Sequence, residues 1–128
     1  MHYLTPEQVL FIHARLIAET CWEHGVRDLG LLQSAGSRPM ATFDGVELYQ
    51  DVHKKAAALM ESLINDHPFV DGNKRTGIAS AAMFLRINGN SLEMSSAKME
   101  SFVLAVASGR QSLESIAEWL RRYSKAVE

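Results

Sequence analysis

The sequence lacks most of the features that mark specialised classes of protein. Its single cysteine, Cys21, excludes an internal disulfide, and no CxxC-type metal pattern is present, so we expect a reducing compartment. Eight glycines and three prolines in 128 residues are too few for a disordered, collagen-like or repetitive chain. No apolar run reaches the roughly 18 residues of a membrane-spanning helix, and residues 1–5 do not resemble a signal peptide. We therefore expect a cytoplasmic protein without a membrane partner.

The charge balance gives no reason to expect a nucleic-acid partner. Thirteen Lys and Arg against fifteen Asp and Glu give a formal net charge of −2. Binding to nucleic acid by counterion release needs a basic face, although a local basic cluster is compatible with this balance. With 47% hydrophobic residues, 128 residues suffice for one domain over the whole chain, 1–128, whereas two domains would each be too small for a good core.

Helical signals dominate, and the sequence shows no internal repeat and no strand pattern of useful length. Capping residues and apolar spacing predict helices from Pro6 to about Thr20, from Asp28 to about Ala35, from about Asp51 to Asp66, from just after Gly72 to Asn88, from Ser95 or Ser96 to Gly109, and from Ser112. Turn residues fill 36–50, and Asp44-Gly45 favours a short hairpin there. We expect an all-α, compact bundle of about six helices, with the helix after Gly72 at its centre and a frayed tail after Tyr123.

One short stretch combines the residue types that bind and transfer phosphate; it runs His67-Pro68-Phe69-Val70-Asp71-Gly72-Asn73-Lys74-Arg75. The first turn of a helix has unpaired N–H groups and the positive end of the helix dipole, so it binds anions. Gly72 allows close approach of a phosphate, and Lys74 and Arg75 add cationic donors. Asp71 could hold a hard metal ion that bridges phosphates, and His67 can accept a proton near neutral pH.

Each of these residues also has an ordinary structural explanation. Lys74 and Arg75 at a helix start are usually just solvated, His67 can simply end a helix, and Asp71 can be an N-cap. Phe69 is expected to anchor the loop in the core under either interpretation. The order of the residues, more than any one of them, therefore indicates a phosphoryl or nucleotidyl transferase.

Few residues outside this stretch indicate a chemistry of their own. We expect His13 to be a buried structural histidine and Cys21 to be a small, partly buried side chain. The pair Lys54-Lys55 is expected to form a solvated face. Trp22 lies beside loop residues, and its exposure would indicate a partner surface.

The run from His67 to Thr76 resembles the signature of the Fic/Doc family. Further stretches resemble its death-on-curing (Doc) branch, so that the resemblance covers nearly the whole chain; they are Gly25–Leu32, Arg38-Pro39, Lys55–Leu59 and Phe84–Gly89. AMP-transferring members usually have Gly where this chain has Lys74, and a second Arg where this chain has Ile78. Both differences favour the Doc branch.

The resemblance implies a Fic/Doc fold and a protein kinase that uses ATP and Mg²⁺. The expected reaction moves the terminal phosphate to a threonine of elongation factor Tu, which arrests translation. His67 would be the general base and Asp71 the Mg²⁺ ligand, and the ATP phosphates would be held by Gly72, Asn73, Lys74 and Arg75. Residues 38–50 lie where relatives carry a flap that positions the target.

The resemblance also implies the toxin of a toxin–antitoxin pair. Other members carry a self-inhibitory Ser/Thr-x-x-x-Glu-Gly/Asn pattern, which Ser96–Ser101 approaches but ends with Ser, so we expect a separate antitoxin protein in trans. Two alternatives stay open. One is a Fic-type AMP transferase, which Lys74 and Ile78 disfavour; the other is a non-catalytic module that binds phosphate or an acidic tail.

Overall fold

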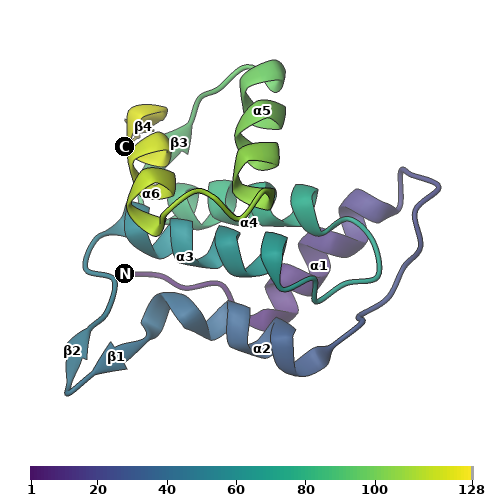
Figure 1. Cartoon of the computed structure of the whole chain (residues 1–128), viewed down its shortest axis with the longest axis horizontal. Helices are drawn as coiled ribbons and strands as arrows, with labels where there is room; N and C mark the ends of the chain where they lie inside the picture. Colours follow the sequence, from purple (N-terminus) through teal and green to yellow (C-terminus); the bar gives the residue numbers. More distant parts are fainter. Residues whose placement is uncertain (128) are drawn as a thin grey trace.

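Six α-helices make up most of the chain, and the computed structural model describes residues 1–127 (Figure 1). The helices are α1 (Pro6–Ile17), α2 (Leu29–Ser37), α3 (Val52–Asn65), α4 (Asn73–Ile87), α5 (Ser96–Ala107) and α6 (Leu113–Arg122), and a short 3-10 helix, η1 (Arg38–Met40), follows α2. Two antiparallel pairs of short strands complete the fold: β1 (Thr42–Phe43) with β2 (Val46–Glu47), and β3 (Asn90–Leu92) with β4 (Ser124–Ala126). The predicted bundle of about six helices with a hairpin is confirmed.

Side-chain caps explain where five of the six described helices begin. The capping side chains accept the N–H group three residues further on, and they belong to Thr5, Asp28, Asp51, Ser95 and Ser112. Each cap lies at or next to a predicted helix start. The exception is α4, whose N-cap is Gly72 and which has no capping side chain.

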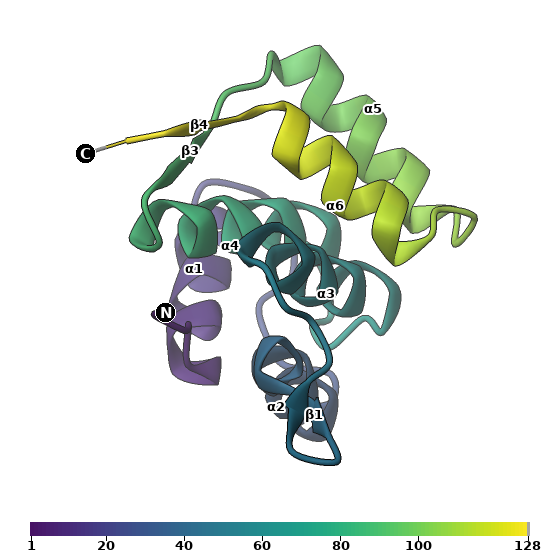
Figure 2. The ribbon, with the colours of Figure 1, turned by 90° about the vertical axis from the view of Figure 1, so that its left-hand side faces the viewer.

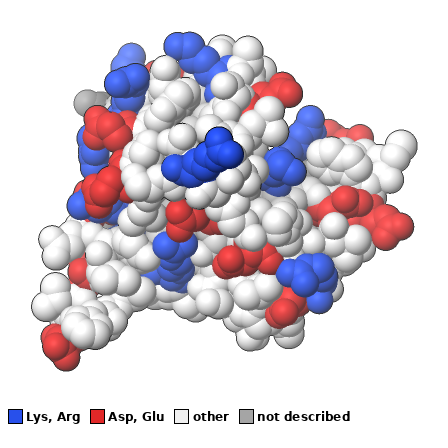
Figure 3. Space-filling model, viewed as in Figure 1, with Lys and Arg blue, Asp and Glu red and all other residues white. Residues whose placement is uncertain are grey.

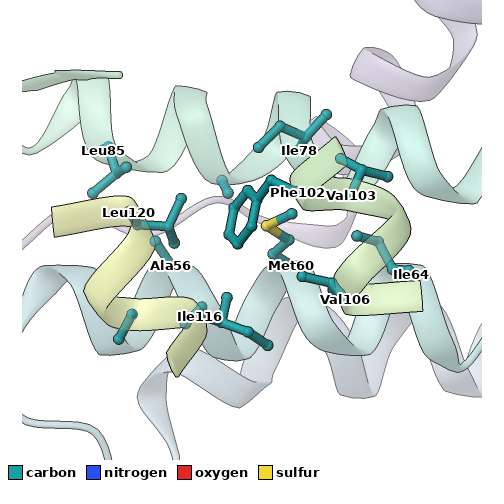
Figure 4. Close-up of a cluster of buried hydrophobic side chains, with 13 residues drawn as sticks. Ala56, Met60, Ile64, Ile78, Leu85, Phe102, Val103, Val106, Ile116 and Leu120 are labelled. Carbon is teal, nitrogen blue, oxygen red and sulfur yellow. The ribbon is translucent and has the colours of Figure 1, made fainter. Parts of the chain in front are cut away.

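Helices α3 and α4 lie side by side through the middle of the molecule, with α5 and α6 on one side and α1 and α2 on the other (Figure 2). One buried cluster fills the space between α3, α4, α5 and α6, with Phe102 pointing toward Met60 (Figure 4). A second cluster, which includes Leu32 and Phe69, packs α3 and α4 against α1 and α2. The central position predicted for α4 is therefore shared with α3, and α4 exposes Met83 and Ile87.

The approach of α3 to α4 depends on Gly77, the residue that directly follows the stretch resembling the family signature. A Cβ atom on Gly77 would lie 2.6 Å from Cγ1 of Ile64, closer than real contacts allow. Gly77 therefore lets the two central helices pack closely just after the first turn of α4. This close packing sets the position of the loop that connects them.

The β1–β2 hairpin projects from the helices, as predicted around Asp44-Gly45 (Figure 1). Both turn residues have left-handed φ angles, 52° at Asp44 and 77° at Gly45, as two-residue hairpin turns require. The side chain of Phe43 is 73% exposed, and Val46 opposite it in the register is also exposed. Much of the hairpin's surface is therefore open to a partner.

A buried lysine connects this hairpin to α3. Lys55 is 1% exposed, and its Nζ donates to the carbonyl of Pro39 at 3.0 Å and to Oε1 of Glu47 at 2.9 Å. At the base of the hairpin, Arg38 donates to the hydroxyl of Tyr49 at 2.9 Å. The predicted solvation of Lys55 is wrong, because residues distant in the sequence supply acceptors for its charge.

Two further expectations need correction. The tail after Tyr123 is not frayed through Ala126, because β4 pairs with β3 and the carbonyl of Tyr123 accepts from Glu93 at 2.7 Å. Cys21 is exposed rather than partly buried, because α1 ends at Ile17, earlier than predicted, and leaves Cys21 in a loop. Among the described helices, none is long and apolar enough to cross a membrane.

Candidate functional site

The loop between α3 and α4 is held in place by the segment that precedes α2. The carbonyl of Pro68 accepts from the N–H of Arg27 at 2.7 Å, and Val70 donates to the carbonyl of Gly25 at 3.1 Å. Between these bonds, Val26 and Phe69 form an isolated antiparallel bridge. The loop therefore has a strand-like partner, although it belongs to no sheet.

His67 follows Asp66, the C-cap of α3, and is exposed to solvent. Its φ angle of 53° lies in the left-handed region that non-glycine residues rarely adopt. The guanidinium of Arg27 holds this conformation, since Nε donates to the carbonyl of His67 at 2.6 Å and Nη2 to that of Asp66 at 2.8 Å. His67 thus turns the chain out of the helix just after the C-cap, and its exposed imidazole is also available to a substrate. Strained, exposed residues of this kind cluster at functional sites.

Phe69 and Asn73 fasten the middle of the loop to the start of α4. The N–H of Phe69 donates to Oδ1 of Asn73, and Nδ2 of Asn73 donates to the carbonyl of Phe69, both at 3.0 Å. The ring of Phe69 is fully buried, which confirms its role as a core anchor. The amide side chain of Asn73 is therefore committed to the loop, and its backbone N–H is the group left for a ligand.

The N-terminus of α4 has free hydrogen-bond donors. In residues 1–127, the N–H groups of Asn73, Lys74 and Arg75 donate to no other protein group, and the first bond of the helix runs from Thr76 to the carbonyl of Gly72 at 2.9 Å. The alternative that Asp71 is an N-cap is wrong, because Gly72 occupies the cap position. Three free N–H groups at the positive end of a helix dipole form an anion-binding site.

Asp71 lies immediately before this anion-binding site and is half-buried. Its Oδ2 accepts from the N–H of Glu23 at 3.1 Å, and its carbonyl accepts from Nε2 of His13 at 2.7 Å. Within the described residues, no group of three or more His, Cys, Asp or Glu could hold a metal ion. Mg²⁺ commonly takes one or two carboxylates, together with phosphate oxygens and water. Asp71 suits a metal site of that kind and not one enclosed by protein.

The cationic side chains of Lys74 and Arg75 are exposed and line a groove of about 500 Å³ between α4 and α5. The guanidinium of Arg75 lies 5.3 Å from the ring centroid of Trp22, which is 40% exposed. Trp22 is thus exposed, which is the condition under which the sequence would indicate a partner surface. The α5 side of the groove was not predicted from the sequence, and it consists of Ser96, Met99, Glu100, Val103 and Leu104.

The site residues predicted from the sequence thus lie along one connection between helices: His67 two residues after α3, Asp71 in the loop, Gly72 as the N-cap, and Asn73 to Arg75 in the first turn of α4. The structure adds a residue that we expected to be only structural. His13 of α1 is buried, and it contacts the loop through the carbonyl of Asp71 and through the ring of Phe69. No pattern local to His13 indicates this contact.

Comparisons with known proteins identify a family and relatives that match most or all of the chain. The profile described as "Fic/DOC family" matches residues 3–85, a range that includes the loop and most of α4. "Toxin Doc" of Mycolicibacterium smegmatis is 44% identical over 105 residues, which cover 80% of this chain and 81% of that protein. "Protein kinase doc" of Escherichia phage P1 is 29% identical over 128 residues, which cover 100% of both chains.

Proposed function

The chain belongs to the Fic/DOC family, and we propose that it is the toxin of a toxin–antitoxin pair and acts as a protein kinase. The names of the two relatives, one a toxin and the other a protein kinase, support this proposal. The observation that carries it is the uncapped start of α4, where three free N–H groups and two cationic side chains follow an exposed histidine by a few residues. This arrangement suits the binding and transfer of a phosphoryl group.

We propose that the N–H groups of Asn73, Lys74 and Arg75 bind the phosphates of ATP, with the side chains of Lys74 and Arg75 adding positive charge. Gly72 has no side chain to cover these donors, and its φ of 82° turns the chain into the helix. The donors are already in place in the folded chain, so little reorganisation is needed when charge develops on the transferred group. When bound, ATP supplies that group.

Asp71 is the proposed ligand of Mg²⁺. Oδ2 of its carboxylate accepts a hydrogen bond from the N–H of Glu23, so Oδ1 remains to coordinate the ion. A single carboxylate is sufficient if phosphates and water complete the coordination. Bound Mg²⁺ would neutralise charge on the phosphates.

His67 is the proposed general base that takes the proton from the acceptor hydroxyl. An imidazole has the right basicity for this step near neutral pH. Its exposure suits an acceptor that belongs to another protein. We propose that the acceptor is a threonine of elongation factor Tu, that its modification arrests translation in the cytoplasm, and that a separate antitoxin protein inhibits the toxin; the resemblance described above supports these three points.

The β1–β2 hairpin is the proposed flap that positions the target chain. Its strands have only each other as partners among the described residues, so their outer edges can pair with an extended segment of the target. Phe43 and Val46 offer exposed apolar contacts for such a segment. Lys55 and Arg38 hold the base of this hairpin.

The test is a reaction of the purified protein with ATP, Mg²⁺ and elongation factor Tu, analysed by mass spectrometry. We expect a phosphate on a threonine of the factor and none with His67→Ala. An adenylyl adduct, which is far heavier, would instead establish the AMP transferase. Ile78, which lines the groove beside Lys74 and has no charge for a phosphate, argues against that result. If no adduct forms and His67→Ala still arrests growth, the protein is a non-catalytic binding module and the proposal is wrong.

A further inference from the structure

His13 makes two contacts with the loop that carries the proposed site. The residue is 2% exposed, in the middle of α1. Its ring stacks on that of Phe69, with centroids 3.8 Å apart and planes 6° from parallel. Its Nε2 lies 2.7 Å from the carbonyl oxygen of Asp71. A carbonyl oxygen only accepts hydrogen bonds, so Nε2 must carry a hydrogen and donate it.

The same face of α1 also packs against Gly72, the next residue of the loop. A Cβ atom on Gly72 would lie 2.9 Å from Cδ1 of Ile17 and 3.6 Å from Nε2 of His13. His13 and Ile17 are four residues apart, so they lie on one face of the helix. Together these two side chains pack against Asp71 and Gly72. They belong to α1, whereas the loop connects α3 and α4.

Asp71 is consequently held at both of its polar ends. His13 donates to its carbonyl, and the N–H of Glu23 donates to Oδ2 of its carboxylate. Without the bond from His13, the peptide between Asp71 and Gly72 could rotate and carry the carboxylate away from Glu23. The orientation of the carboxylate therefore depends on α1, far from Asp71 in the sequence.

We propose that His13 is a positioning residue, whose Nε2–H holds the carbonyl of Asp71 so that the Asp71 carboxylate faces the metal and phosphate site with Oδ1 free. The inference rests on the proposed function only for the role of Asp71 as a metal ligand. The orientation of Asp71 can be measured without nucleotide, metal or turnover.

Two variants distinguish the role of His13 as a hydrogen-bond donor from the packing of its aromatic ring. His13→Phe keeps an aromatic ring against Phe69 and loses the donor, whereas His13→Gln loses the ring and keeps an N–H near the position of Nε2. His53→Phe is a matched control, because His53 is a partly buried histidine on α3 whose Nε2 has no partner among the described residues. It reports the effect of replacing an imidazole away from the loop.

The first measurement is the amide proton resonance of Glu23 by NMR, since this N–H donates to Asp71 and reports where the carboxylate lies. We expect His13→Phe to shift it toward its position in Asp71→Ala, and His13→Gln and His53→Phe to leave it near the wild-type position. If His13→Phe leaves it unchanged, or if His13→Gln shifts it as far as His13→Phe, the proposal is overturned.

The second measurement is the Mg²⁺ concentration at half-maximal phosphate transfer. We expect it to rise about ten-fold in His13→Phe, the usual cost of losing a residue that orients a metal ligand, and to stay near wild type in His13→Gln. An equal rise in both variants contradicts the proposal. If the wild-type protein transfers no phosphate, the proposed function fails, and the Glu23 resonance still decides the role of His13.

A measurement on the wild-type protein covers the case in which His13→Phe does not fold. The ring of His13 should show a hydrogen on Nε2 that exchanges slowly with solvent in a ¹H–¹⁵N spectrum, because that nitrogen is buried and donates to a carbonyl. A bare Nε2 at neutral pH would contradict the proposal without any substitution.

Discussion

Two separate constraints act on Gly72 at the scale of single residues. Its φ of 82° disfavours any side chain, and the space where a Cβ would lie is occupied by Ile17 of α1. Gly109 has a similar φ of 75°, but no atom lies within 4 Å of its hypothetical Cβ. The two glycines therefore allow backbone strain to be separated from the loss of space.

We predict that Gly72→Ala lowers the free energy of unfolding by about 1–3 kcal/mol, more than Gly109→Ala does, because strain and a clash combine. Chemical denaturation of both variants measures the difference. The same change should impair ATP binding, since any adjustment moves the start of α4. Equal losses of stability in the two variants would show that Ile17 does not restrict this position.

Arg75 and Trp22 offer a direct probe of nucleotide binding. The guanidinium of Arg75 lies 5.3 Å from the exposed ring of Trp22, so a phosphate that draws Arg75 away should change the fluorescence of this tryptophan. We predict that Arg75→Ala weakens ATP binding by about 10- to 100-fold, because it removes a charged hydrogen-bond donor. Trp22→Phe is the control that assigns the signal, since the other tryptophan is Trp119. Unchanged ATP affinity in Arg75→Ala would exclude a role for this side chain.

At the residue scale, features that depend on adjacent residues could be predicted. The residues from His67 to Arg75 lie on one loop and the first turn of α4, so their common location could be predicted from their adjacency in the sequence. The burial of Lys55 could not, because its acceptors on Pro39 of η1 and Glu47 of β2 are brought to α3 only by the fold. The contact of His13 with Asp71, 58 residues away, has the same explanation.

At the scale of secondary-structure elements, helix starts were the most predictable feature. A capping side chain is adjacent to the helix that it caps, so Asp51 and Ser112 could be identified without knowledge of the fold. The pairing of β3 with β4 joins segments far apart in the sequence, and strands of three residues leave no periodic signal. The absence of a capping side chain at α4 also depends only on adjacent residues, and it coincides with the candidate site.

The hairpin is the element whose attachment can be tested most cleanly. Burial lowers the pKa of Lys55, but its interactions with Glu47 and Tyr3 together more than offset this, so the net shift raises the pKa above 10.5 and the amine stays charged. We predict that Lys55→Met lowers the free energy of unfolding by about 1–3 kcal/mol, because the carbonyl of Pro39 loses its donor.

Lys55→Met should also reduce modification of the target protein while leaving ATP binding unchanged, since Lys55 contacts the hairpin and not the start of α4. Hydrogen exchange of the hairpin amides, measured together with ATP affinity, checks both parts. Lys54→Met on the neighbouring, partly exposed lysine is the control. A loss of ATP binding in Lys55→Met would show that the hairpin and the phosphate site are not independent.

At the scale of the whole molecule, the candidate site lies at one end of the central α3–α4 pair, where the connecting loop meets elements from both sides. Phe69 ties the loop to the cluster shared with α2, and Ile78 belongs to the cluster shared with α5 and α6. Charges of both signs are interspersed on the face seen in Figure 3, in keeping with the net charge of −2. The proposed recognition of phosphate would therefore depend on the local donors of α4 and not on the overall charge of the chain.

Stability of the whole molecule should decrease in mild acid, because two histidines are harder to protonate in the folded chain. Burial, and then the positive charge of Arg121, lower the pKa of His53 below its usual 6.5; burial likewise lowers the pKa of His13, outweighing its bond to Asp71. Below pH 6.5 the unfolded chain binds protons that the folded chain does not, so the free energy of unfolding falls as the pH falls. Above pH 6.5 both states are neutral at these positions, and the stabilisation is fully present.

Urea unfolding at pH 7.5, 6.5 and 5.5 measures this dependence. We expect the free energy of unfolding to be lowest at pH 5.5, and the decline to be shallower in His53→Phe, which removes one of the two groups. His53 is far enough from the loop in the sequence and in its contacts that this variant should retain ATP binding, so the effect can be assigned to protonation of His53 and not to damage at the site. A protein that becomes more stable between pH 7.5 and 5.5, or a His53→Phe variant with the wild-type slope, would mean that burial of this imidazole does not govern the acid response.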